Sequence, residues 1–457
     1  MPQPTSLWFE TALGGASWQT GVRISMAHDR IAEIDAGTTP AAADQRHGIA
    51  LPGVTNLHSH AFQRGMAGLA EVRGPSHDSF WTWREIMYRF LSAMTPDDVE
   101  AVAALAYLEM LETGFTRVAE FHYLHHTPSG EPYHNPAEMA GRIAAAGDIT
   151  GISVALLPCF YAHGGIGGAA PVAGQRRFIT SLDQFSDVVD KCAAIGSTPA
   201  FRVAGLAPHS LRAVTEAEIR TVIELAAGRP IHMHVSEQPK EVDDCLAWSG
   251  RRPLDWLLDR FDLSNWCLIH ATHTTPVELQ RAAEHGAIIG LCPITEANLG
   301  DGIFRSAEWV ALGGALGVGT DSNVLIGLAD ELRQLEYAQR LGSGMRNAIA
   351  NTEGQSTGRL LFDRALVGGA CAVGLTSADC GLTIGATADI IDLDPEHVSL
   401  VGRAGDALID GWMFGANRSA IRNVWSRGRH VVADGQHIAR PAIEARYRAV
   451  IRRVMAA

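Results

Sequence analysis

The sequence has no apolar run long enough to cross a membrane as a helix. One of its longest apolar stretches, residues 309–319, is rich in glycine and falls far short of the roughly 20 residues that a membrane-spanning helix needs. The first ten residues, MPQPTSLWFE, contain neither a basic start nor an apolar core, so we expect no secretory signal. The sequence therefore predicts a soluble protein of the cytoplasm.

Paired cysteines are also missing from the sequence. Its 7 cysteines are odd in number, are scattered along the chain and include no CxxC pair. This usage is typical of reduced, mostly buried thiols, because disulfide frameworks need paired cysteines and an oxidising compartment. The cysteines therefore agree with a cytosolic protein.

Positive charge is scarce. The 37 Lys and Arg residues are outnumbered by 50 Asp and Glu residues, which gives a net charge of −13 with histidine neutral. The chain has no run of Lys and Arg of the kind that binds nucleic acid. We therefore expect neither a nucleic acid nor an anionic membrane as its main partner.

The length and the apolar content allow a large core. At roughly 150 residues per domain, 457 residues correspond to about three domain-sized units, or to one large barrel with a smaller appendage. The hydrophobic share of 47% suits a chain of this size, since long chains bury most of their unfolded surface.

Both ends of the chain have the pattern of β-strands. Short alternating apolar stretches separated by turn residues occupy residues 6–51, and the same pattern returns in the tail, with a turn at Asp434–Gly435. A last helix is expected at 440–457. We predict that the ends, 1–51 and 386–457, pair into one small β domain.

The middle of the chain, residues 52–385, alternates short apolar runs with stretches of helical spacing. This alternation predicts an α/β fold of parallel βα units. One predicted helix, 96–113, begins with an N-cap threonine, a proline and two acidic residues. Long loops are expected at 125–136, 163–175 and 342–358, and the glycine-rich second one is a candidate lid.

Histidine and aspartate follow four separate apolar runs in this middle region. In a (β/α)₈ barrel the carboxyl ends of the strands meet on one face, where active sites lie. Imidazoles and a carboxylate that converge there form a good ligand set for zinc or a similar metal. The sequence therefore predicts a metal site, built from members of this group: His58 and His60, His232 and His234, His270 and His273, and Asp321.

At these positions the sequence resembles the amidohydrolase superfamily, and within it the deaminases that use one metal. The likeness covers nearly the whole chain and rests on LPGVTNLHSHAFQRG (51–65), HVSE (234–237), His270 and GTDS (319–322). It implies a (β/α)₈ TIM-like barrel over 52–385 with a small β-sandwich domain from both termini.

The resemblance also implies the ligands. No lysine ends the run 201–208, where two-metal members carry a bridging residue, so we expect one divalent metal, with Zn²⁺ as the best match. His232 is expected to be structural. The implied metal ligands are His58, His60, His234 and Asp321.

Further motifs, FWTWRE (80–85), AEFHYLHH (119–126) and APHSLR (207–212), resemble those of the N-formimino-L-glutamate deiminases of histidine degradation. These enzymes turn formiminoglutamate into formylglutamate and ammonia, so the implied partner is a small dianionic substrate. Two arginines would offer a planar fork to each substrate carboxylate. The implied substrate-binding residues are Arg84 and Arg212, aided by Gln63, Tyr123 and His209.

Three residues are candidates for proton handling in this hydrolysis. We expect Asp321 to take or hold the proton of the attacking water, and Glu237 to relay a proton to the leaving nitrogen. His270 would orient the attacking oxygen or stabilise the charge that develops there.

Two other functions compete with this hypothesis. A deaminase of a nucleobase or an adenosine-like compound would keep the metal but need stacking aromatic residues, and the aromatic residues at 80–83 are candidates for either a pocket wall or plain core. A metal-free scaffold relative would be expected to lack ligands that this sequence retains. The roles of His273 and Ser322, and an assembly such as a homodimer, are left open.

Overall fold

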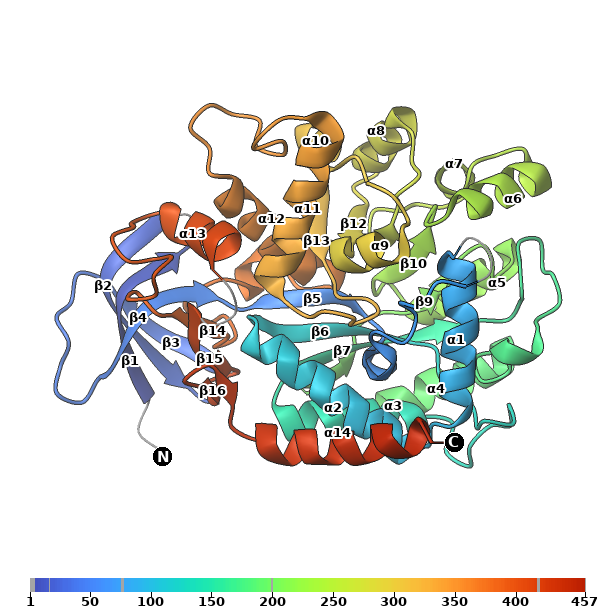
Figure 1. Cartoon of the computed structure of the whole chain (residues 1–457), viewed down its shortest axis with the longest axis horizontal. Helices are drawn as coiled ribbons and strands as arrows, with labels where there is room; N and C mark the ends of the chain where they lie inside the picture. Colours follow the sequence, from blue (N-terminus) through green and yellow to red (C-terminus); the bar gives the residue numbers. More distant parts are fainter. Residues whose placement is uncertain (1–4, 16, 75–77, 199, 417–419, 457) are drawn as a thin grey trace.

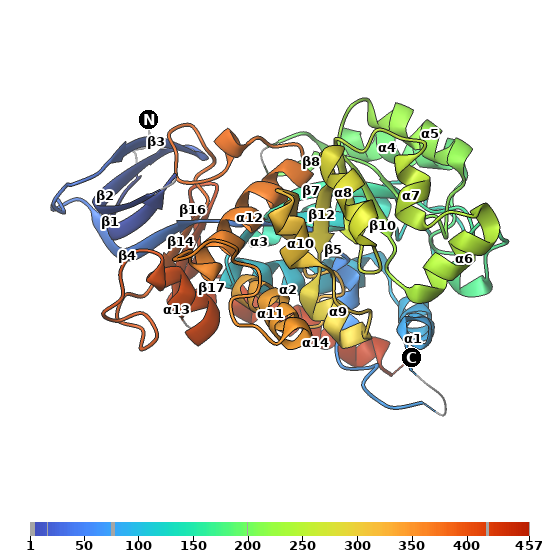
Figure 2. The same ribbon diagram turned by 90° about the horizontal axis from the view of Figure 1, so that it is seen from above.

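The computed structural model describes residues 5–15, 17–74, 78–198, 200–416 and 420–456. A barrel of parallel strands and surrounding helices forms the larger part, and a sheet built from both ends of the chain lies beside it (Figure 1, at the left). Figure 2 shows the same two parts from above. In the described part of the chain, no helix is both long and apolar enough to cross a membrane.

The terminal sheet has eight strands in the order β17-β16-β15-β14-β4-β1-β2-β3. Its two halves meet where β4 pairs antiparallel with β14 and parallel with β1. The predicted β domain of both termini is therefore confirmed, and hydrogen bonds connect all its strands in one continuous sheet. The strands are β1 (Thr5–Gly14), β2 (Ser17–Ala27), β3 (Arg30–Asp35), β4 (Gln45–Pro52), β14 (Ile390–Leu393), β15 (Ile421–Ser426), β16 (Arg429–Ala433) and β17 (Gln436–His437).

Alternating apolar residues explain this sheet. In β2 the side chains of Val22, Ile24 and Met26 are buried while the residues between them are partly exposed. Successive strand residues point to opposite faces, so this spacing places one apolar face against a small core that also contains Phe9 and Trp425.

The barrel strands come in two hydrogen-bonded groups that short bridges join into a ring. Ser59 pairs with Asp321 across the first and last strands, and Leu206 pairs with Ile231 in the middle. The predicted TIM-like barrel is therefore confirmed. Its strands are β5 (Val54–Ser59), β6 (Phe115–His122), β7 (Ser153–Phe160), β8 (Phe201–Val203), β9 (Ala207–Pro208), β10 (Ile231–Val235), β11 (Trp266–His270), β12 (Ile288–Leu291) and β13 (Ala315–Val318).

The helices surround the barrel (Figures 1 and 2). The one predicted at 96–113 is α2, in which Thr95 accepts a hydrogen bond from the N–H of Asp98 and the Asp98 carboxylate accepts from the N–H of Thr95. The α-helices are α1 (Phe80–Ser92), α2 (Pro96–Glu112), α3 (Glu138–Thr150), α4 (Leu182–Ile195), α5 (Glu216–Ala226), α6 (Pro239–Ser249), α7 (Pro253–Leu258), α8 (Pro276–Glu284), α9 (Pro293–Leu299), α10 (Ser306–Ala311), α11 (Leu328–Ser343), α12 (Thr357–Ala372), α13 (Ala407–Gly415) and α14 (Arg440–Val454). Short 3₁₀ helices are η1 (Ala61–Met66), η2 (Ala173–Gln175) and η3 (Ser377–Asp379).

The predicted C-terminal helix is α14, and it lies along α2 of the barrel (Figure 1). The two helices are joined by ion pairs between Arg440 and Glu112 and between Arg446 and Glu100. Ala457, where the sequence analysis ended this helix, lies outside the described residues.

Two local predictions differ from the structure. The run 201–208 forms two short strands, β8 and β9, separated by residues 204–206, and at Gly205 a Cβ atom would lie 2.3 Å from the carbonyl oxygen of Pro230. The loop predicted at 342–358 is shorter, since α11 continues to Ser343 and α12 already begins at Thr357.

Candidate active site

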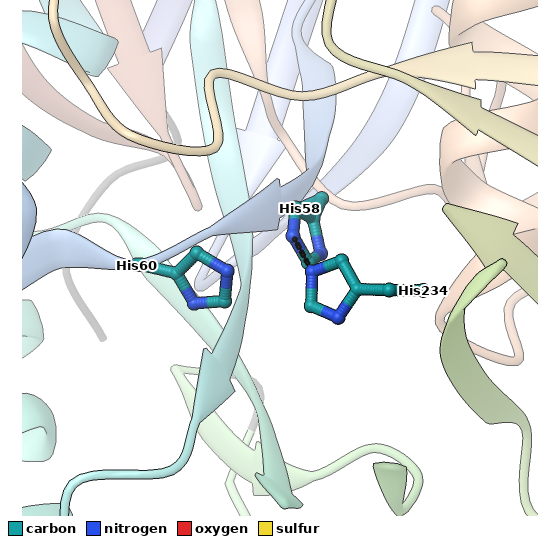
Figure 3. Close-up of side chains that lie close together, drawn as sticks. All are labelled: His58, His60 and His234. Carbon is teal, nitrogen blue, oxygen red and sulfur yellow. Dashed lines mark hydrogen bonds between the residues drawn. The ribbon is translucent and has the colours of Figure 1, made fainter. Parts of the chain in front are cut away.

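Four side chains converge at the carboxyl ends of the barrel strands. His58 lies in β5 and His60 directly after it, His234 lies in β10, and Asp321 follows β13. Figure 3 shows the three imidazole rings turned toward one point, His58 and His60 from one strand and His234 from another. The carboxyl ends of parallel barrel strands meet on one face, and the residues expected to bind metal therefore lie together.

The distances within this group suit a cation. The Nε2 atoms of His58 and His234 are 3.1 Å apart, and Oδ1 of Asp321 lies 3.4 Å from Nε2 of His60 and 3.6 Å from Nε2 of His58. Zinc bonds of about 2.0–2.1 Å in tetrahedral geometry place neighbouring ligand nitrogens roughly 3.3 Å apart. The donor set therefore fits a zinc-like ion bound between these atoms.

Neighbouring carbonyl groups orient two of the rings. Nδ1 of His60 donates to the carbonyl oxygen of Phe121 at 3.0 Å, and Nδ1 of His234 donates to that of His209 at 3.0 Å. A carbonyl oxygen can only accept, so both rings carry their proton on Nδ1 and turn the lone pair of Nε2 toward the shared point.

Burial keeps these histidines neutral, as metal ligands must be. It lowers the pKa of His58 to about 3 and also lowers the pKa values of His60 and His234. Burial alone would raise the pKa of Asp321, but a hydrogen bond with His58 and the positive charge of His270 hold that pKa below its usual range.

His270 lies between two carboxylates at the end of β11. Its Nε2 atom is 3.8 Å from Oδ2 of Asp321 and 4.0 Å from Oε1 of Glu237, while its Nδ1 atom is 3.1 Å from Oε1 of Glu296. Burial opposes a charged ring here, but the bond with Glu296 and the charges of Glu237 and Asp321 outweigh it and raise the pKa of His270 to about 10. The ring is thus poised as a cation.

A pocket opens beside this group, and the residues predicted to bind substrate line it. Gln63, Arg84, Tyr123, His209 and Arg212 all face the same cavity as Glu237 and His270, and His58 lies just behind the wall, fully buried. The lining consists of His60, Gln63, Phe80, Trp83, Arg84, Met87, Tyr88, Tyr123, Tyr161, Phe178, His209, Arg212, His234, Glu237, His270, Leu299 and Asp321.

The two arginines of the pocket have different surroundings. The guanidinium of Arg84 lies over the rings of Trp81 and Tyr88, 4.8 and 5.6 Å from their centroids, and its buried Nε atom has no partner among the described residues. Arg212 instead donates from Nη2 to Oε2 of Glu237 at 2.5 Å. Arg84 is therefore the freer of the two cations.

Gln63 and Tyr123 form a neutral hydrogen-bonding corner of the pocket. The Nε2 atom of Gln63 donates to the hydroxyl of Tyr123 at 2.8 Å, and the buried Oε1 atom of Gln63 has no partner in the described part of the chain. Buried polar atoms of this kind are usually satisfied, so this corner is suited to a polar ligand.

Several residues of the site were not predicted from the sequence. Tyr161 directly follows β7. The argument that placed the histidines at the carboxyl ends of the barrel strands therefore applies to Tyr161 as well. Met87 and Tyr88 come from α1, and Glu296 comes from α9. Nothing in the sequence pattern distinguishes these three, because their positions depend on how the helices pack.

The other histidines singled out in the sequence lie outside the pocket lining. Nε2 of His232 donates to the carbonyl oxygen of Ala372 at 2.7 Å, as expected for a structural residue, and Nε2 of His273 donates to that of Asp301 at 2.8 Å. Ser322 shares a 2.9 Å hydrogen bond with Thr295.

Comparison with known proteins places the chain in a family. Residues 49–431 match the model of the amidohydrolase family, and residues 7–48 match the N-terminal domain of formimidoylglutamate deiminase HutF. The formimidoylglutamate deiminase of Pseudomonas aeruginosa is 46% identical over 438 residues, which cover 95% of this chain and 96% of the relative.

Solved structures agree with this assignment. A crystal structure of an amidohydrolase from Brucella melitensis has a TM-score of 0.94 and 50% identity, with 99% of this chain and 100% of that chain covered. An adenosine deaminase from Xanthomonas campestris with bound zinc shares the fold at a TM-score of 0.79 and 18% identity, with 99% of each chain covered. On the family models and the nearly full-length relative, the chain belongs to the amidohydrolase family.

Proposed function

We propose that this chain hydrolyses N-formimino-L-glutamate to N-formyl-L-glutamate and ammonia, a step of histidine degradation. The observation that carries the proposal is a single pocket in which two arginines, Arg84 and Arg212, face a group of three histidines and an aspartate. The name and the 46% identity of the Pseudomonas aeruginosa relative support the same activity.

The substrate is an amidine with two carboxylates, and the pocket offers matching donors. Nε of Arg84 has no hydrogen-bond partner among the described residues, and the hydrogen bonds of Arg212 to Ser210 and Glu237 come from its Nε and Nη2 atoms. Arginine binds carboxylates through paired, charge-assisted hydrogen bonds. The corner of Gln63 and Tyr123, together with His209, would complete the binding of one carboxylate.

The same proposal includes one divalent metal, with zinc as the best match. His58, His60, His234 and Asp321 would hold it, since three neutral imidazoles and a carboxylate suit a first-row metal and leave room for water. When bound, such a metal polarises the substrate and lowers the pKa of a coordinated water toward neutrality.

The remaining steps belong to residues of the chain. The carboxylate of Asp321 accepts the proton of the attacking water, and the cationic ring of His270, 3.8 Å away, stabilises negative charge on the attacking oxygen. Glu237 carries this proton to the formimino nitrogen and then the proton of the hydroxyl group left on the carbon. With two protons gained, the nitrogen leaves as ammonia while the carbon becomes the carbonyl of formylglutamate. The Nε2 atom of His270 lies 4.0 Å from Oε1 of Glu237, beyond hydrogen-bond reach, so His270 acts on Glu237 through its charge.

The test is a substrate panel. Purified protein is expected to release ammonia from formiminoglutamate and to leave formylglutamate, whereas glutamate with formamide would mark cleavage of the other bond. Guanine, cytosine and adenosine serve as the alternative substrates, because the aromatic lining of Phe80, Trp83 and Tyr161 could also stack a flat ring. Faster turnover of a nucleobase would overturn the proposal.

The metal requires a separate measurement. We expect elemental analysis to find close to one divalent ion per chain, and removal by a chelator to abolish ammonia release until zinc is returned. A preparation that stays active without any bound metal would contradict this part of the proposal.

We propose the cytoplasm as the place of action. All the cysteines that the structure describes are free, and five of them are buried: Cys159, Cys192, Cys245, Cys267 and Cys292. Such usage agrees with a reducing compartment. Fractionation of cells that produce the protein would test it.

A further inference from the structure

A buried carboxylate behind the pocket holds the turn that carries Glu237. Glu241 lies in the first turn of α6 and is fully buried. Its Oε1 atom accepts the N–H of Ser236 at 2.9 Å, and its Oε2 atom accepts the N–H of Glu237 at 3.2 Å. Both oxygens of Glu241 thus accept hydrogen bonds from the backbone, one from Ser236 and one from Glu237, the proposed proton carrier.

This turn needs such support. Ser236 has a φ of +51°, in the left-handed region that side chains other than glycine rarely adopt. The turn must reverse direction between β10, which ends at Val235, and α6, which begins at Pro239. The N–H of His273 also donates to the carbonyl oxygen of Ser236 at 3.0 Å, so both backbone polar groups of this residue are fixed.

Glu241 also faces Arg212. Its Oε2 atom lies 3.7 Å from Nε of Arg212, whose Nη2 group donates to Glu237 at 2.5 Å. The guanidinium is therefore held between two carboxylates, one from the pocket and one from behind it. With Arg212 fixed in this way, the Glu237 carboxylate is held in one orientation. Nη1 of Arg212 makes neither of these two contacts and is available to a substrate carboxylate.

From this geometry we infer that Glu241 is a positioning residue: it aligns Glu237 for proton transfer and Arg212 for substrate binding without touching the substrate itself. The inference rests on the proposed function, because it takes the roles of Glu237 and Arg212 from there. Displacing a reacting group by about 1 Å can slow an enzyme roughly a hundredfold. The effect of Glu241 should therefore appear mainly in kcat.

The first test is Glu241→Gln, which keeps the size of the side chain. The amide can accept only one of the two N–H groups, and its NH₂ group then faces a donor. We expect kcat for formiminoglutamate to fall by about tenfold to a hundredfold, with unchanged metal content. KM should rise less than kcat falls.

Glu336 supplies a matched control. It is also fully buried, accepts the N–H groups of Ala348 and Ile349 at 2.7 and 3.1 Å, and bonds Nε of Arg340 at 2.8 Å, but it lies outside the pocket lining. Glu336→Gln should lower the melting temperature about as much as Glu241→Gln while leaving kcat unchanged. If Glu241→Gln and Glu336→Gln lose kcat equally, Glu241 has only a structural role and the inference is wrong.

A double variant separates positioning from general damage. If Glu241 acts through Glu237, the loss from Glu241→Gln should largely vanish in a Glu237→Gln background, because the carrier to be aligned is already gone. Full additivity of the two losses would overturn the inference. Should Glu241→Gln fail to fold, Glu241→Asp tests the same point, because it keeps the charge but is too short to reach both N–H groups.

The proposed function and the role of Glu241 are tested by different measurements. Wild-type protein on the substrate panel decides the substrate, and the variants are compared on whichever substrate it turns over. A wild type inactive toward formiminoglutamate would therefore refute the proposed function, while the ratio of variant to wild type would still decide the role of Glu241.

Discussion

At the scale of single residues, the site consists of charges that compensate one another over short distances. His270 is paired with Glu296 and lies near Asp321, and Arg212 is paired with Glu237. Buried charges are stable only with such partners, since desolvation otherwise outweighs their interactions. The removal of one partner should therefore lower stability as well as activity, because the other charge stays buried without compensation.

The first prediction concerns Glu237. Glu237→Gln removes the proton carrier but keeps its size and a hydrogen-bond acceptor for Arg212. General acid–base groups typically contribute about 10²–10⁴-fold, so kcat should fall within that range. Metal content should stay at the wild-type level, because Glu237 is not among the side chains grouped as ligands. Near-normal ammonia release by this variant would contradict the role assigned to Glu237.

The second prediction concerns Arg84. Arg84→Met keeps the length of the side chain and its contact with Trp81 but removes the charge. Hydrogen bonds to charged groups contribute about 1.5–3 kcal/mol, so KM for formiminoglutamate should rise by roughly 10- to 100-fold with a smaller change in kcat. Steady-state kinetics of ammonia release measures both constants.

Arg89 provides the control for Arg84. It lies in the last turn of the same helix, is exposed and does not line the pocket. Arg89→Met should leave KM unchanged. A substrate analogue that lacks one carboxylate should reduce the difference between Arg84→Met and wild type if Arg84 binds that carboxylate. An equal increase of KM in Arg84→Met and Arg89→Met would instead indicate a general effect of the charge of the protein.

Some residues of the site are brought together by a feature that the sequence shows directly. Parallel strands of a barrel end on one face, which predicted that His58, His60, His234 and Asp321 lie near one another, and the family resemblance selected these four from the larger group. Glu296 and Glu241 could not be placed in this way, because each lies on a helix and reaches its partner only through the packing of that helix. Local spacing contains no information on such contacts.

At the scale of elements, α12 positions the first and last strands of the barrel. A Cβ atom on Gly368 would lie 1.9 Å from the carbonyl oxygen of Leu316 in β13, and one on Gly369 would lie 2.8 Å from that of Thr55 in β5. The helix thus touches the backbone of the two strands that lead to Asp321 and His58. A side chain at this contact would push α12 away from the two strands.

The third prediction follows from this contact. Gly368→Ala should destabilise the protein by about 1–3 kcal/mol, the usual cost of overpacking, and should lower activity because β13 leads to Asp321. Thermal unfolding and ammonia release measure the two effects. The neighbouring Val367 is exposed, so Val367→Ala should change neither quantity. Unchanged stability of Gly368→Ala would show that the helix can shift without cost.

The sequence predicted elements better than their irregularities. The helix at 96–113 was confirmed to within one residue because its cap and its apolar spacing are local signals. The division of 201–208 into β8 and β9 was missed, and between them Gly205 lies close to the carbonyl oxygen of Pro230. Such a contact between distant backbone segments leaves no signal in local spacing.

At the scale of the whole molecule, charged pairs fasten the end of the chain to the barrel. Arg440, Arg446 and Arg453 of α14 bind Glu112, Glu100 and Asp98 of α2. The partners are more than 300 positions apart in the sequence. Order along the chain therefore grouped α14 with the terminal β domain, while its contacts are with the barrel.

The distribution of charge at this scale leads to the fourth prediction. The chain carries a net charge of −13 with histidine neutral, whereas the proposed substrate is a dianion. At about 0.01 M salt the screening length is about 30 Å, so the whole molecule repels the substrate; at about 0.1 M it is about 10 Å. The attraction of Arg84 and Arg212 acts within the pocket and is screened far less.

Added salt should therefore raise kcat/KM for formiminoglutamate between about 0.01 M and 0.1 M, because it weakens the long-range repulsion more than the local attraction. The analogue that lacks one carboxylate should respond less, since the repulsion scales with the substrate charge. Chloride that competes for the arginines would raise KM at higher salt, so sulfate and chloride are compared at equal ionic strength. A steady fall of kcat/KM over the whole range would mean that the positive pocket, and not the acidic surface, dominates the approach of the substrate.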